Sequence, residues 1–303
     1  MSILQAILPI FAATLLPVFL VAGLGALLAG FIDLDERTLG RVIFYLATPS
    51  LVLRSLYQME IDYGALQRIA LVAVLVAFTM GAVAWLAGFD QARGRRAALI
   101  LTGAVSNNGN MGLPICFFAF GAPGLSLGAV YYVVTSFLSN TLGVVVASAG
   151  SAPLGIALRN SLRAPVLYAA ILGVTLNRTG ITLPTGLFRA VDLLAGAAIP
   201  GMLVLLGIQL RNAPLRQSDP LIPRAVAIRL IAAPLLAWLL TRMLGLSGLT
   251  QNVVILQASM PTAVMMGVLA TEYDAAPRLV ATIIFFSTLL SMITLSVVLW
   301  YIL

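Results

Sequence analysis

Residues 106–114 read Ser-Asn-Asn-Gly-Asn-Met-Gly-Leu-Pro and lie inside the stretch 97–158, which contains no Asp, Glu, Lys or Arg. Pro114 lacks a backbone N–H, and its ring clashes with the carbonyl four residues earlier, at Asn110. The helix is therefore predicted to open over Gly109–Leu113. Backbone groups freed inside a lipid bilayer must face protein or a water-filled cavity. The stretch thus predicts a broken helix with a polar centre in an otherwise apolar chain.

The composition places this broken helix in a membrane protein. Of the 303 residues, 61% are hydrophobic and only 9% are charged, against roughly a quarter charged in soluble proteins. Uncharged runs long enough to cross a bilayer recur along the chain. These runs cover residues 1–32, 69–89, 97–158, 243–271 and 279–303. The net charge of +7 comes with arginines in short gaps between apolar runs, which is typical of a membrane protein and not of a nucleic-acid-binding one.

Splitting the runs at charges and turn residues predicts an all-α polytopic membrane protein with ten transmembrane helices. The tetrapeptide Gly121-Ala122-Pro123-Gly124 separates the fourth from the fifth. The predicted ranges are Leu4–Phe31, Leu39–Leu56, Ala65–Phe89, Arg96–Ala119, Gly124–Ala149, Gly155–Asn177, Leu183–Leu210, Ile222–Leu244, Leu249–Glu272 and Pro277–Leu303. Of the 17 arginines, twelve, including Arg229, fall in connections and flanks on one side. The positive-inside rule makes this side cytoplasmic and leaves both termini outside.

Prolines suggest an internal repeat. Three pairs are separated by about half the chain, namely Pro17 with Pro165, Pro49 with Pro200, and Pro114 with Pro261. If residues 1–150 and 151–303 are each a five-helix unit, the odd number of spans inverts the second unit relative to the first. Inverted repeats are typical of secondary transporters. The alternative is coincidence, because membrane helices are enriched in proline.

The second half contains a counterpart of the broken helix. Residues 257–263 read Gln-Ala-Ser-Met-Pro-Thr-Ala inside the ninth predicted span. Two broken helices that meet in the membrane bring two helix N-termini together, and their positive dipole ends suit an anion. The alternative is that Asn and Ser join neighbouring helices while Pro merely kinks them. Paired interruptions at equivalent positions favour the binding-site interpretation.

At these residues the chain resembles the auxin efflux carrier family, the PIN-like transporters. The likeness is specific at Asn107–Pro114 and in the segment that runs from Met260-Pro261-Thr262-Ala263 through Glu272-Tyr273 to residues 287–291. The resemblance implies that broken spans four and nine cross at a central site. It also implies a mobile bundle of spans three to five and eight to ten, and a scaffold of spans one, two, six and seven that forms a homodimer. Bacterial members are associated with small organic acids such as malonate and malate.

The resemblance further implies a set of site residues in an inner-membrane carrier that works by an elevator mechanism. Asn107 matches the recurrent Asn of the family, and Pro114 and Pro261 match its crossover prolines. Thr135 and Ser136 stand where relatives often have Gln-Asn. The candidate substrate-binding residues are Asn107, Asn108, Asn110, Pro114, Thr135, Ser136, Ser259, Pro261 and Thr262.

Asp192 is an acid well inside a predicted span, and such acids are candidate coupling residues. Arg189 lies three residues earlier on the same helical face, and an ion pair between the two is the favoured interpretation. Spans four, five and nine have no charged residue before Glu272. An organic anion would therefore be held by amide N–H groups and helix dipoles.

The residue inventory disfavours an enzyme. The chain has no His and a single Cys, Cys116, so neither a His/Cys metal site nor a Ser-His-Asp triad can form. No metal or cofactor is expected. A cation-coupled symporter of the bile-acid type is the alternative, with Gln257 as the nearby candidate ion ligand. A channel stays open as well, and flux that saturates with substrate would separate a carrier from it.

Overall fold

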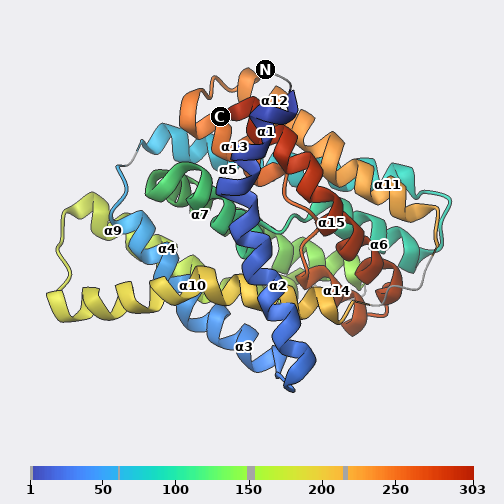
Figure 1. Cartoon of the computed structure of the whole chain (residues 1–303), viewed down its shortest axis with the longest axis horizontal. Helices are drawn as coiled ribbons and strands as arrows, with labels where there is room; N and C mark the ends of the chain where they lie inside the picture. The colour runs from blue at the N-terminus through green and yellow to red at the C-terminus, as the bar shows by residue number, and fades with distance from the viewer. Residues whose placement is uncertain (1–2, 61, 149–153, 214–217) are drawn as a thin grey trace.

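The computed structural model describes residues 3–60, 62–148, 154–213 and 218–303 (Figure 1). Regular structure in these ranges is helical, apart from one antiparallel bridge between Ser106 and Thr262. The α-helices are α1 (Ile3–Ile10), α2 (Leu16–Phe31), α3 (Glu36–Val42), α4 (Thr48–Tyr57), α5 (Tyr63–Ala87), α6 (Arg93–Ala104), α7 (Leu113–Ala147), α8 (Leu154–Leu162), α9 (Pro165–Thr179), α10 (Thr185–Arg211), α11 (Leu221–Ala227), α12 (Ala233–Met243), α13 (Gly248–Ala258), α14 (Met265–Glu272) and α15 (Pro277–Ile302).

Within the described ranges, 7 helices are long and apolar enough to cross a membrane. They cover Ile7–Phe31, Glu36–Tyr57, Tyr63–Ala87, Asn108–Ala147, Thr185–Arg211, Leu221–Met243 and Pro277–Ile302. The remaining predicted spans are interrupted, between α6 and α7, between α8 and α9, and between α13 and α14. The chain is thus an all-helical polytopic membrane protein, and the count of ten spans stays a prediction. The predicted end of span five, Ala149, lies outside the described residues.

The turn predicted at Gly121 is confirmed. Gly121 interrupts α7 with a φ of 65° and a ψ of −155°, a left-handed backbone conformation that glycine adopts without steric penalty. The long apolar run is therefore folded back on itself at this residue, as the tetrapeptide predicts.

Four of the prolines follow π-helical turns in the described part of the chain. The turns are η1 (Phe11–Leu15) before Pro17, η2 (Ile43–Ala47) before Pro49, η3 (Asn108–Gly112) before Pro114 and η4 (Ile228–Ala232) before Pro234. In each case the carbonyl that would clash with the proline ring, four residues earlier, belongs to the middle residue of the wider turn. The π-turn therefore admits proline within a continuous helix. Pro165 instead starts α9, so its predicted partner Pro17 has a different local structure.

The helices pack in two groups. In the first group α10 contacts α2 and α4, and α4 contacts α9; α2 crosses α10 in Figure 1. Helices α5, α6, α12, α13, α14 and α15 form the other group. Helix α7 contacts both groups, and its residues Leu113, Leu125 and Ala129 belong to the apolar core of the first. The segment around the predicted site is thus enclosed between the two groups.

Two glycines bring α2 and α10 into backbone contact. A Cβ atom on Gly207 would lie 1.8 Å from the carbonyl oxygen of Ala22, and one on Gly25 would lie 2.4 Å from that of Val204. Small residues allow this close approach in membranes, where helix association depends on van der Waals packing. The contact joins spans one and seven tightly.

We predict that Gly207→Ala lowers the free energy of unfolding by about 1–3 kcal/mol, the usual penalty for overpacking. Gly196→Ala on the same helix is the matched control, because a Cβ atom there meets nothing within 4 Å. Thermal unfolding of purified protein in detergent measures both. A Gly207→Ala protein as stable as wild type would contradict the backbone contact.

Candidate functional site

Two interrupted helices cross inside the molecule. The residues that follow α6 run antiparallel to those that follow α13. The N–H of Asn107 donates to the carbonyl of Pro261 at 2.7 Å, and the N–H of Ala263 donates to that of Val105 at 3.1 Å. These bonds pair backbone groups that the helix breaks leave without intrahelical partners, as a membrane interior requires.

The first break begins earlier than the sequence predicts. Opening was expected over Gly109–Leu113, but the extended backbone comes directly after Ala104, and Asn108–Gly112 forms the π-turn η3. The reason is that the π-turn already accommodates Pro114, while the antiparallel contact with span nine stabilises the extended residues before it. The predicted break was therefore misplaced by a few residues.

Asn108 holds the crossing together. Its Nδ2 donates to the backbone carbonyl of Gln257 at 2.7 Å and to the side-chain Oε1 at 2.9 Å, and its Oδ1 accepts from Ser106. Gln257 in turn donates from Nε2 to the carbonyl of Gly128 in α7. The amide of Gln257, the candidate ion ligand of the alternative interpretation, is thus bonded to protein on both sides. A Cβ atom on Gly112 would lie 2.2 Å from Gln257 Oε1, so this network also needs a glycine.

Asn107 differs from its neighbour. It is 5% exposed, and its Nδ2 finds no hydrogen-bond partner among the described residues. A buried donor left unpaired costs about 1–3 kcal/mol. Such a group is expected where a ligand supplies the missing acceptor, and Asn107 lies directly before the N-terminal end of η3, opposite Pro261 in the segment between α13 and α14.

The hydroxyl groups of the other candidates bond within the protein. Thr135 donates to the carbonyl of Tyr131 on its own helix, and Ser259 donates to that of Ile255. Thr262 reaches across the crossing to the carbonyl of Thr102 at 2.9 Å.

The predicted residues come from three segments, and hydrogen bonds across the crossing are made by Asn107, Asn108, Pro261 and Thr262. Asn107, Asn108 and Asn110 lie at η3, Pro114, Thr135 and Ser136 on α7, and Ser259, Pro261 and Thr262 between α13 and α14. Of the asparagines, Asn110 is half-buried and the other two are buried. Ser287 on α15, which was not predicted, accepts from the N–H of Thr262.

Asp192 pairs with a residue other than the predicted one. Its Oδ1 accepts from Arg54 Nη1 at 2.8 Å, and 55% of its side chain is exposed. Arg54 reaches it because α10 packs against α4, whereas the prediction considered only the residue one turn away, Arg189. The Arg189–Asp192 pair was therefore wrong. The acid lies in an exposed ion pair away from the crossing.

Arg229 was also misassigned. It is predicted to flank a span on the cytoplasmic side, but it is fully buried inside the span Leu221–Met243. Its position seven residues into the predicted helix Ile222–Leu244 was the available signal. Its Nη1 donates to the carbonyl of Gly103 at 3.0 Å, and its Nη2 donates to that of Ala258.

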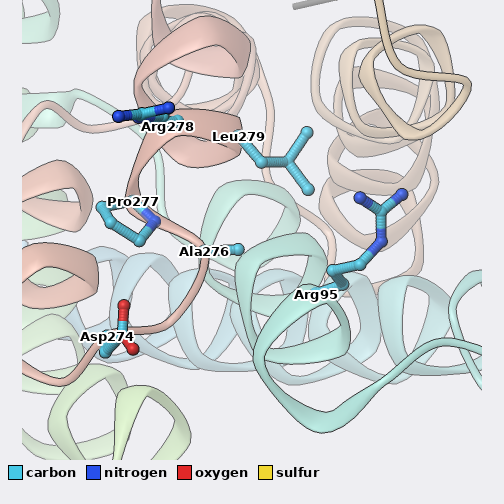
Figure 2. A pocket seen from close by; sticks show the side chains of 6 residues that line it. All are labelled: Arg95, Asp274, Ala276, Pro277, Arg278 and Leu279. Atoms are coloured by element: carbon cyan, nitrogen blue, oxygen red, sulfur yellow. The ribbon is translucent and has the colours of Figure 1, made fainter.

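A cavity of about 310 Å³ lies away from the crossing, where α14 joins α15 (Figure 2). It is lined by Arg95, Asp274, Ala276, Pro277, Arg278 and Leu279. The guanidinium of Arg95 comes from α6 and binds both carboxylate oxygens of Asp219, at 2.8 and 3.0 Å. Partial burial opposes the ionised form of Asp219, but the bonds from Arg95 and the Leu221 N–H outweigh it and hold the pKa of this carboxyl below its usual value. The cavity contains none of the candidate residues.

In the described ranges, seven apolar helices of membrane length and two interrupted helices that cross at buried polar groups define a multi-pass membrane protein. The sequence pattern of the family described as membrane transport protein matches residues 3–154 and 151–299. The chain therefore belongs to this family, in which the auxin efflux carriers are also found, and the predicted resemblance is confirmed.

Named relatives support this assignment. The chain is 32% identical to an uncharacterized transporter of Methanothermobacter thermautotrophicus, over 86% of this chain and 87% of the relative. It is 26% identical to a putative malonate transporter of Rhizobium meliloti, over 95% and 94%. It is 28% identical to the probable auxin efflux carrier component 1b of Oryza sativa subsp. japonica, over 44% of this chain and 25% of the relative.

Replacing Asn107 and replacing Asn108 by alanine should affect the stability of the protein differently. Asn108→Ala leaves the buried oxygens of Gln257 without their donor, so we predict a loss of about 1–3 kcal/mol in the free energy of unfolding. Asn107→Ala removes a donor that is already unpaired, so its stability should equal or exceed that of wild type. Thermal unfolding of the ligand-free proteins tests both, and equal destabilisation would contradict the division of roles.

The Arg54–Asp192 pair should be structural and weak. We predict a coupling energy below about 1 kcal/mol in a double-mutant cycle of Arg54→Gln and Asp192→Asn, as for other exposed ion pairs. Transport by Asp192→Asn protein in liposomes, assayed between about pH 5.5 and 8, should keep the wild-type pH profile, since a coupling proton requires an acid that changes charge during the cycle. Loss of the pH dependence in well-folded protein would make Asp192 a coupling residue.

Proposed function

We propose that this protein carries a small organic anion across the membrane by alternating access around the crossing of spans four and nine. The unpaired, buried Nδ2 of Asn107 carries the proposal. It lies at the N-terminal end of the half-helix that begins with η3, where partial positive charge and N–H groups without intrahelical partners favour an anion. The second half-helix, α14, begins a few residues beyond the paired segment. A carboxylate would accept the hydrogen bond that Asn107 lacks.

A carboxylate is the substrate class that best fits this chemistry. The half-helices and α7 contain no Asp or Glu before Glu272, so no acid near the crossing repels an anion. Similarity to a relative named as a putative malonate transporter supports the same class. Asn110, half-buried on the same π-turn as Asn108, is a further candidate donor.

The proposed architecture has ten spans in two inverted units, residues 1–150 and 151–303. The contacts of α10 with α2 and α4, and of α4 with α9, support a scaffold of spans one, two, six and seven, which would dimerise. Spans three to five and eight to ten would move against it in an elevator mechanism. Without Arg229, eleven of the twelve arginines still support a cytoplasmic side opposite both termini, in the inner membrane of a bacterial cell.

Efflux needs no coupling ion in this scheme. A membrane potential that is negative inside drives an anion outward by about 2.3 kcal/mol per charge per 100 mV. Gln257 has no free amide to bind a cation, because Asn108 and Gly128 engage it. We therefore favour an uncoupled carrier over the sodium-coupled alternative.

Binding of mono- and dicarboxylates to purified protein, with and without sodium, tests the proposal. Asn107→Ala should weaken binding by roughly 10- to 100-fold, because a hydrogen bond to a charged group contributes about 1.5–3 kcal/mol. Asn212→Ala is the matched control, since Asn212 is exposed at the end of α10. Unaltered binding by Asn107→Ala would place the site elsewhere, and binding that requires sodium would favour the symporter.

A further inference from the structure

Arg229 links the C-terminal ends of both interrupted half-helices. Gly103 lies in the last turn of α6, and Ala258 is the last residue of α13. Their carbonyls belong to the groups that a helix end leaves without intrahelical partners. Each accepts from one terminal nitrogen of the Arg229 guanidinium. A single side chain from the span Leu221–Met243 thus caps the two half-helices that lead into the crossing.

The charge of Arg229 has no carboxylate to balance it. The sequence contains no Asp or Glu between Asp90 and Asp192, nor between Asp219 and Glu272. These two acid-free stretches supply α6, α7, α13 and most of α14, as well as the helix that contains Arg229. Burying an unpaired charge is strongly unfavourable. The negative ends of the two half-helix dipoles are the groups that offset it here.

Arg229 changes the net charge around the crossing. A helix end carries a partial charge of about half a unit, positive at the N-terminus and negative at the C-terminus. Two C-terminal and two N-terminal ends meet at the crossing, and together they sum to about zero. With Arg229 on the C-terminal ends, the sum becomes about one positive charge, located at the N-terminal ends and Asn107.

We propose that Arg229 is a specificity-determining residue that makes the crossing a site for one negative charge by neutralising the C-terminal ends of α6 and α13. This inference rests on the proposed function and adds the charge selectivity of the same site. Arg229 acts through the half-helices and does not itself contact the anion. Its guanidinium suits this position because its two terminal nitrogens reach two carbonyls at once.

The separation along the chain between Gly103, which Arg229 contacts, and Asn107 sets the expected effect of the Arg229 charge on ligand affinity. Gly103 and Asn107 are four residues apart, which limits the distance between them to roughly 13 Å, the length of a fully extended backbone. At this distance and an effective dielectric constant of about 20, Coulomb's law gives about a tenfold factor in the affinity for one unit charge.

The test uses three molecules of similar shape and different charge, namely malonate, its half-amide malonamate and the uncharged malonamide, with binding measured at pH 6.5. Wild type should prefer the charged ligands. In Arg229→Gln the ratio of malonamate to malonamide affinity should fall by about tenfold. Arg229→Lys keeps the charge and should keep the ratio, while both variants should unfold at a lower temperature because one or both carbonyl contacts are lost.

Arg224→Gln is the matched control, because Arg224 on α11 is exposed whereas Arg229 is buried. Its affinity ratio should equal that of wild type. An unchanged ratio in folded Arg229→Gln, or an equal fall in the Gln and Lys variants, would overturn the inference while leaving the proposed function intact. Failure of wild type to bind any of the three would overturn the proposed carboxylate function itself, and the inference with it.

Wild type alone provides a second measurement if Arg229→Gln does not fold. A site with about one positive charge should gain more affinity from the first ligand charge, between malonamide and malonamate, than from the second, between malonamate and malonate. An equal or larger gain from the second charge would contradict a site for one negative charge.

Discussion

Backbone hydrogen bonding inside a membrane is the constraint on which the rest of this structure depends. Two helices end in the interior, and the groups that they leave unpaired have no water to bond. Backbone hydrogen bonds between Val105–Asn107 and Pro261–Ala263 supply the missing partners and thereby join the two breaks. Each break supplies the backbone hydrogen-bond partners of the other. Neither span could therefore remain interrupted in the membrane without the other. The surrounding packing of α7 and α15 follows from the need to enclose this junction.

The polar side chains near the junction divide into two sets. Asn108, Gln257 and Thr262 bond to protein groups across the crossing and thereby fix its geometry. Asn107 keeps a buried donor unpaired. A polar network in a low-dielectric interior is stabilising only when its members are satisfied, so this unpaired amide before the N-terminus of η3 is where function is expected. Arg229 binds the C-terminal ends of α6 and α13, the half-helices that lead into the junction, and so brings a positive charge to it.

Local rules explain what could be predicted from the sequence. The proline and glycine rules identified the breaks in spans four and nine, the turn at Gly121 and the polar stretch that forms the junction, because each depends on residues close together in the chain. The start of the first break, the partner of Asp192 and the burial of Arg229 depend on contacts between distant segments. Arg54, for example, is 138 positions from Asp192. Spacing along one helix could only suggest Arg189. The position of Arg229 within a predicted helix indicated burial, but its partners, the carbonyls of Gly103 and Ala258, lie in distant segments.

The π-turns before four prolines also affect how the faces of these spans are assigned. Each turn amounts to one residue inserted into an α-helix, which rotates everything beyond it by about 100° around the axis. Residues at α-helical spacing on either side of Pro17 or Pro234 consequently point in different directions. A helical wheel drawn through either span therefore has to be restarted at the turn, or it would exchange lipid-facing and buried positions in half of the helix.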